Sequence, residues 1–275
     1  MKVRLTSTYF LIALTFSTTI MLFVVQNKTK NLRQKFEKRY MSSFLTDNTN
    51  ANSTINEPDA VYFTNDCDCK KDTKVAIIKK EKFSSVYLEK QNEEIKHLYD
   101  LTNAEIEKSI LTCDFFNTLR RGKSQKIISY SLYNKKRFFY DKLKEITKQL
   151  KILYPNWTMR VYYDKTIDKS IICEIECQKD DNGILLDNAD FCDTNNLTFK
   201  LENIKNSNQS SFDASYIHSM IWRWFPIGDS FVDVFSSRDT DSFLLQREVD
   251  SVNVWFNSDK VGHIMRGENV YKFNL

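Results

Sequence analysis

The 275-residue sequence is poor in glycine, proline and histidine, with five, three and three residues of each. Three histidines argue against a metal site built from histidine and cysteine. The formal net charge of +4 is small, and no nucleic-acid-binding motif accompanies it, so nucleic acid is not an expected partner. The whole sequence is 41% hydrophobic and 28% charged, which is the composition of an ordinary folded protein.

One long apolar segment runs without a charge from Leu5 to Gln26. At about 20 residues it is long enough to cross a bilayer as a helix. A cleaved signal peptide is the alternative, but its apolar core is usually about 7–15 residues long and precedes a small-residue cleavage site, which this segment lacks. Residues 1–26 are therefore predicted to form a cytoplasmic tip and an uncleaved signal anchor.

Two signals conflict on the orientation of this anchor. Six basic residues between 28 and 39 follow the span and two precede it, which by charge alone predicts a cytoplasmic downstream side. Against this, five Asn-x-Ser/Thr acceptors and six cysteines all follow the span, at Asn27, Asn52, Asn156, Asn196, Asn208, Cys67, Cys69, Cys113, Cys173, Cys177 and Cys192. An even cysteine count favours disulfides in an oxidising compartment. We expect a type II glycoprotein of the Golgi or endoplasmic-reticulum membrane with a lumenal head; a reduced, cytosolic chain is the alternative.

The cysteine spacing matches no zinc pattern, and six cysteines allow about 15 disulfide pairings. Nearness in the chain leads to the hypothesis that Cys192 pairs with Cys173 or Cys177.

Residues 27–110 are expected to form a lumenal stem. The stretch from Asn27 to about Ser84 is rich in Asn, Thr, Lys and Asp, a composition that buries too little apolar surface to order itself. Apolar residues between Val86 and Leu111 are loosely spaced as in a helix, which predicts one or two packing helices. The head is then predicted at residues 111–275.

The head alternates between strand and helix patterns. Residues 126–133 and 157–164 predict strands, and the apolar spacing from Phe139 to Leu153, closed by Pro155, predicts a helix between them. Strand, helix, strand is the pattern of a parallel unit. Further expectations are loops with a short strand at 165–211, a helix at 214–225 capped by Asp213 and ended by Pro226, a helix at 248–256 and a strand at 262–266. This alternation predicts an open α/β sheet with its site at the C-terminal ends of the strands.

An acidic pair follows one apolar run of the head. Residues 231–237 read as a buried strand, and Asp239 and Asp241 come directly after it, separated by one residue. Side chains alternate along an extended chain, so both carboxylates can face one divalent ion. Mg²⁺ and Mn²⁺ prefer such oxygen ligands and complete their shells with water and substrate phosphates. The alternative is a solvated turn, because Asp, Thr and Ser are ordinary turn residues.

With these features the chain resembles metal-dependent glycosyltransferases of the GT-A fold, and more narrowly a poorly characterised group of them. The resemblance covers residues 126–266 in three ordered blocks, at 129–133 with 154–162, at 220–223 with 233–242, and at 247–255 with 263–266. It implies an open, mostly parallel sheet with flanking helices, Mn²⁺ or Mg²⁺ as cofactor, a nucleotide-sugar donor, and a glycan, protein or lipid acceptor.

The resemblance also implies roles for individual residues. Asp241 is expected to bind the metal, and Asp239 to bind the donor ribose or the water shell of the metal. The nucleotide pocket is expected to be lined by Ser129, Tyr130, Ser131 and Leu132, and the diphosphate to be met by Arg223 and Arg238. Structural ion pairs are the alternative for the two arginines. His263 is a candidate base, for which a structural role is the alternative.

The chain departs from the family pattern after His263-Ile264-Met265-Arg266. The family pattern continues there with a long segment on the acceptor side, whereas in this sequence only residues 267–275 follow. The expectation is therefore an incomplete transferase domain, with a catalytically inactive lumenal protein as the alternative function.

Overall fold

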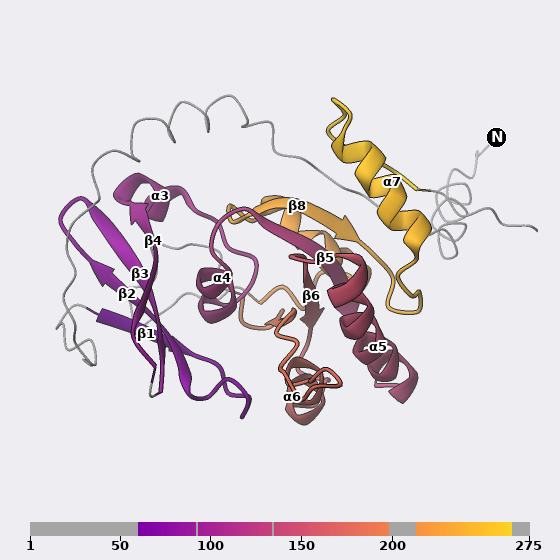
Figure 1. Ribbon diagram of the computed structural model, residues 1–275, viewed down its shortest axis with the longest axis horizontal. Helices are drawn as coiled ribbons and strands as arrows, with labels where there is room; N and C mark the ends of the chain where they lie inside the picture. Colours follow the sequence, from indigo (N-terminus) through magenta and orange to yellow (C-terminus); the bar gives the residue numbers. More distant parts are fainter. Residues whose placement is uncertain (1–59, 92, 134, 198–212, 266–275) are drawn as a thin grey trace, which may run out of the picture.

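The computed structural model describes residues 60–91, 93–133, 135–197 and 213–265. The predicted anchor at residues 1–26 and residues 27–59 of the predicted stem lie outside these ranges. Within them, no helix combines the length and the apolarity that a membrane span requires. The described chain has a mixed α/β fold with two four-stranded sheets side by side (Figure 1).

The first sheet is antiparallel, and its strands are neighbours in sequence order. They are β1 (Ala60–Thr64), β2 (Thr73–Lys79), β3 (Phe83–Lys90) and β4 (Lys96–Thr102). The second sheet is parallel throughout. Its spatial order is β7 (Ala189–Asp193), β6 (Thr158–Tyr163), β5 (Gln125–Leu132) and β8 (Val232–Ser237). This parallel sheet with its helices confirms the architecture predicted for the head.

Helices cover both faces of the parallel sheet, which explains why nearly every residue of its strands is buried. On one face lie α5 (Arg137–Leu153), α6 (Lys169–Glu176) and α7 (Gln246–Phe256), and the 3-10 helix η2 (Ser219–Gly228) lies on the other. The two remaining helices, α3 (Asn103–Lys108) and α4 (Phe115–Arg121), contact the antiparallel sheet. One face buries Leu143, Ile146 and Leu150 of α5 against Tyr130 of β5 and Trp255 of α7. The spacing of three and four residues in α5 produces this apolar stripe, as predicted.

The antiparallel sheet corrects the prediction of a polar stem followed by helices. Residues 60–84 contain β1 and β2, and residues 86–111 contain most of β3, all of β4 and only one short helix, α3. The sheet has its own core, in which Val75 and Ile77 pack on Phe116 and Leu119 of α4. The lysines that flank the short apolar runs lower the average hydrophobicity of the segment, although β2 buries four successive residues, Val75 to Ile78.

Three other predicted elements differ from the structure. The helix expected at 214–225 is the 3-10 helix η2, which contains Pro226 and is capped by His218. Asp213 caps only a local turn, accepting a bond of 2.9 Å from the Ser215 amide. Residues 165–211 include helix α6 in addition to the short strand β7. Residues 262–265 form no strand, because they lie beside α7 and outside the sheet register.

Three disulfides join residues 67–113 to residues 173–192, which fits a lumenal or secreted protein. Cys67 and Cys69, in the β1–β2 loop, bond to Cys173 and Cys177 in and after α6. The third bond joins Cys113 to Cys192, so the hypothesis that Cys192 pairs with Cys173 or Cys177 was wrong. Nearness in the chain did not decide the pairing, because the sheets bring residues 79 positions apart into contact.

A buried ionic cluster lies beside the first two disulfides. Asp190 at the start of β7 is fully buried and receives Arg121 at 2.9 Å and Arg120 at 3.2 Å. Lys70, also buried, lies 3.4 Å from Glu176 of α6. The cluster joins the β1–β2 loop, α4, α6 and β7, and is the polar part of the joint between the two sheets.

Stability is expected to fall below about pH 4 because of Asp190. Burial alone would raise the pKa of this carboxyl, but the guanidiniums of Arg121 and Arg120 lower it to about 2. The folded pKa is therefore below the unfolded one, so its contribution of about 2 kcal/mol is complete above pH 4 and is lost between about pH 4 and pH 2. The free energy of unfolding, measured with urea at several pH values in this window, should show the loss.

The control variant is Asp190→Asn. It is needed because burial raises the pKa of Asp114 and Glu176, which gives the opposite dependence of stability on pH. Equal pH slopes for the two proteins would contradict the assignment.

Candidate functional site

The candidate site lies where the strand order of the parallel sheet reverses. The chain passes from β5 to β6 and β7 in one direction, and β8 returns to the other side of β5. In open α/β sheets, ligands bind outside the carboxyl ends of the strands at such a switch point. Asp239 and Asp241 follow β8 directly, so the loop that carries them begins at this edge. Figure 1 shows this loop between the arrowhead of β8 and helix α7.

Asp239 is half-buried and forms an ion pair with Arg223 of η2. Helix η2 is fixed against the sheet, because the Arg223 amide donates a bond of 3.0 Å to the Ser131 hydroxyl of β5. The same guanidinium donates to the Arg238 carbonyl at 3.4 Å. Arg223 therefore connects the ends of β5 and β8, and its predicted contact with a diphosphate competes with its bond to Asp239.

Asp241 is exposed, and its carboxylate accepts a bond of 3.1 Å from the Ser242 hydroxyl. A solvent-facing carboxylate suits Mg²⁺ or Mn²⁺, which accept one or two carboxylates and fill the shell with water and phosphate. Asp239 fits less well, because Arg223 already occupies one of its oxygens. In the part of the chain that the structure describes, no three metal-binding side chains come together. Of the two carboxylates, Asp241 is therefore the one open to a cation.

Arg238 points away from this edge, into the core. It is 2% exposed and pairs with the buried Glu248 of α7, and it donates a bond of 2.8 Å to the Phe243 carbonyl. Burial alone would lower its pKa, but Tyr130 and Glu248 raise it, so the guanidinium stays charged. The predicted contact of Arg238 with a diphosphate does not fit this placement. The alternative, a structural ion pair, does.

The four residues predicted to line the nucleotide pocket lie inside β5 and are buried. Ser129 and Ser131 face η2, whereas Tyr130 and Leu132 belong to the core on the opposite face. Burial raises the pKa of Tyr130 to about 12. All four are closed off from solvent, and the Ser131 hydroxyl is already bonded to the Arg223 amide.

His263 lies beside α7, where its Nε2 is 2.8 Å from the Ser251 hydroxyl. It is half-buried. Its bond to a helix residue fits the structural alternative better than the predicted role as a base.

Two further acids, Asp164 and Asp193, lie at the same edge of the sheet and were not predicted as site residues. Asp164 follows β6 and Asp193 ends β7, so the pattern of a strand followed by a carboxylate would have found them. Burial raises the pKa of Asp193, and Asp164 and Asp213 add to the rise. Each of the two caps its own turn, at 2.9 Å from the amides of Thr166 and Asn195, respectively. Strand β5 separates them from the loop that follows β8.

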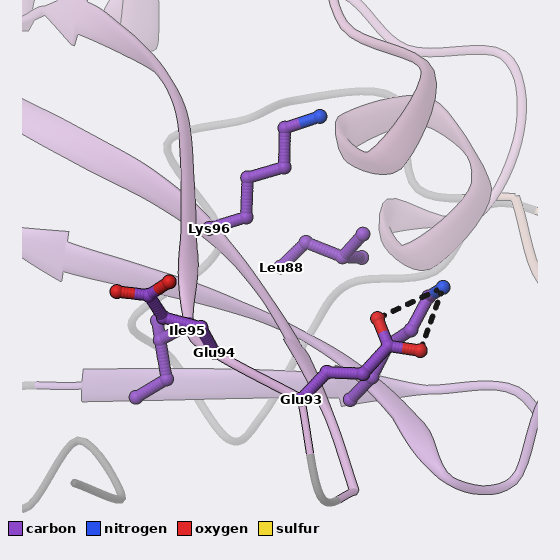
Figure 2. A pocket seen from close by; sticks show the side chains of 6 residues that line it. Leu88, Glu93, Glu94, Ile95 and Lys96 are labelled. Atoms are coloured by element: carbon purple, nitrogen blue, oxygen red, sulfur yellow. Dashed lines mark hydrogen bonds and ion pairs between the residues drawn. The ribbon is translucent and has the colours of Figure 1, made fainter. Parts of the chain in front are cut away.

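A pocket of about 610 Å³ lies at the β3–β4 hairpin, remote from the acidic pair. It is lined by Leu88, Lys90, Glu93, Glu94, Ile95 and Lys96. Figure 2 shows Glu93 turned to the Lys90 amine, whereas the Lys96 amine points away from both glutamates. Two lysines and two glutamates balance in charge, which gives no preference for a charged ligand.

Comparison with known proteins finds no matching family, no similar curated protein and no similar solved structure. A function for this chain therefore rests on its own sequence and geometry.

Proposed function

We propose that the chain is a glycosyltransferase that binds a nucleotide-sugar donor through a divalent ion at the loop after β8. The observation that carries the proposal is the position of Asp239 and Asp241 at the switch point of a parallel sheet. The resemblance to GT-A glycosyltransferases points to the same loop. Two independent considerations, topology and motif, therefore select the same residues.

The roles of the residues follow from their contacts. Asp241 would hold the ion, and Arg223 would keep Asp239 oriented beside it. Bound Mn²⁺ or Mg²⁺ would supply positive charge to the diphosphate as it leaves the sugar. Arg238 and Glu248 support the loop from the core side, since Arg238 holds the Phe243 carbonyl two residues beyond Asp241.

The compartment belongs to the same proposal. Three disulfides and the apolar segment at residues 5–26 support a type II protein of the Golgi or endoplasmic-reticulum membrane, with the described residues in the lumen. The acceptor in such a compartment would be a glycan, a protein or a lipid.

A second candidate function is a lumenal protein with a transferase-like fold and no turnover. The ion pair between Arg223 and Asp239 favours it, because it occupies one of the two proposed ligands. The bond between His263 and Ser251 favours it as well, because it engages the candidate base.

Binding of nucleotide diphosphates to the purified protein in the presence and absence of Mn²⁺ tests the donor site. We expect metal-dependent binding that weakens by about 10- to 100-fold in Asp241→Ala, a loss typical of a damaged metal site. Asp239→Ala should weaken it less, because Asp239 already contacts Arg223.

The matched control is Asp259→Ala, which removes another carboxylate that is 86% exposed. It should bind like the natural chain. Equal binding with and without the metal, in a protein with its three disulfides formed, would reject the donor site. Metal-dependent binding without donor hydrolysis or transfer would select the second candidate function.

A further inference from the structure

We propose that Asn156 is N-glycosylated, and that this happens before β6 enters the parallel sheet. The site is Asn156-Trp157-Thr158, in the turn between α5 and β6. Asn-x-Thr is the acceptor sequence for N-glycosylation in secreted and lumenal chains. The inference rests on the three disulfides, which indicate an oxidising compartment, and not on the proposed transferase activity.

The position of Asn156 suits a glycan in the folded protein. Its side chain is exposed, and its backbone has a φ of 69°, a left-handed turn conformation in which Asn is enriched. The residue precedes β6, so it lies at the N-terminal edge of the parallel sheet, whereas Asp239 and Asp241 lie beyond the C-terminal edge. A glycan on Asn156 would leave the candidate site open.

The other two residues of the acceptor sequence are closed off after folding. Thr158 is 8% exposed and lies in register with Ile127 of β5. Trp157 is 7% exposed and packs on Tyr154 and on Phe256 of α7, with ring centroids 5.3 and 6.1 Å apart. An enzyme that must bind Thr158 to modify Asn156 can therefore do so only while β6 is not paired in the sheet.

The order of synthesis leaves time for modification before β6 is enclosed. The partners that enclose the segment include β7, which begins at Ala189, and α7, which ends at Phe256. Both are synthesised after Thr158, and at about 5–20 residues per second the segment waits for seconds before they exist. Modification during synthesis is therefore possible, whereas modification after folding requires β6 to open.

The chemistry needs one co-reactant, an oligosaccharide carried on a lipid diphosphate. The amide nitrogen of Asn156 bonds to the anomeric carbon of the oligosaccharide, and the bond from that carbon to the diphosphate oxygen breaks. The lipid diphosphate leaves, and one amide proton passes to a base of the transferring enzyme. The product is a neutral side chain, so the electrostatics of the turn do not change.

The first test is translation of the full chain with membranes of the endoplasmic reticulum. The peptide containing Asn156 should carry a glycan that an amidase removes. Asn156→Asp, which tolerates the same turn conformation, and Thr158→Val, which keeps the β-branched shape, should each lose one glycan. Thr158→Ser should retain it, because serine also completes the acceptor sequence. An unmodified Asn156 in the natural chain, with or without glycans elsewhere, would overturn the proposal.

The second test concerns timing. The full chain, folded with its three disulfides and without glycans, is presented to the detergent-solubilised transferring enzyme with its lipid-linked donor. Modification of Asn156 should be about tenfold or more below that of the same chain reduced and unfolded, because reaching Thr158 requires local opening of the sheet. Equal modification of both forms would show that β6 does not restrict access and would overturn the order of events.

Discussion

Removal of both disulfides between the β1–β2 loop and α6 is expected to destabilise the protein by about 5 kcal/mol or more, whereas removal of one of them costs about 2 kcal/mol. The two bonds close almost the same loop, because Cys67–Cys173 and Cys69–Cys177 span 106 and 108 residues. While one bond remains, the other restricts only the few residues between them. The free energy of unfolding of Cys67→Ala/Cys173→Ala and of the variant lacking all four cysteines, from denaturant titration, measures this difference.

The third disulfide is the matched control for this prediction. Cys113–Cys192 closes a loop of 79 residues with no neighbouring bond, so its removal alone should cost about 4 kcal/mol. If one bond of the pair proved as costly as Cys113–Cys192, loop closure would not explain the stabilisation. Native-state contacts around each cysteine would then have to account for it.

Replacement of Asp229 by alanine is expected to destabilise the protein by about 3–5 kcal/mol, since it leaves the buried charge of Arg160 without an opposite charge. Arg160 of β6 and Asp229 are both fully buried and lie 2.8 Å apart. Asp229 also accepts bonds from the amide and the hydroxyl of Thr112, at 3.0 and 2.9 Å. An arginine side chain is not deprotonated in proteins, so the guanidinium of Arg160 remains charged when Asp229 is lost.

Two further variants separate this explanation from a general loss of packing. Arg160→Met combined with Asp229→Ala removes both charges and should recover part of the stability in denaturant titration. Asp141→Ala removes the partner of Arg137 in a pair of similar length, 3.2 Å, whose side chains are 70% and 54% exposed. It should cost less than about 1 kcal/mol. A double variant no more stable than Asp229→Ala would show that the unpaired charge is not the cause.

The parallel half of the fold was predictable because its local signals agree. The apolar residues of α5, such as Leu143 and Leu150, recur at helical spacing, and the flanking strands are rich in β-branched and aromatic residues. The antiparallel half was not predictable, since β3 and β4 carry charged and polar residues among their apolar ones, such as Glu89, Lys90, Lys96 and Asp100. In such mixed segments, helix and strand spacing are hard to distinguish, and the apolar residues of the sheet find their partners in α4, which lies outside the strands.

For the candidate site, the position of the acidic pair was predictable and the environment of its neighbours was not. A strand followed by Asp239 and Asp241 indicates an edge of a sheet by itself. The direction of Arg238 follows from alternation along β8, which places it on the same face as Val234, in the core with α5 and α7. That Arg238 pairs with Glu248 is decided only by the way α7 packs on the sheet.

The sequence by itself determined the parallel α/β unit and the acidic pair after its last strand, because both depend on residues close together in the chain. The tertiary structure alone decided the antiparallel sheet, the disulfide pairing and the ion pairs of Arg223, Arg238 and Arg160. The disulfides and the pair of Arg160 with Asp229 join residues 69 or more positions apart. The pairs of Arg223 and Arg238 depend on where η2 and α7 pack, and the antiparallel strands, although neighbours in the chain, bury their apolar residues against α4.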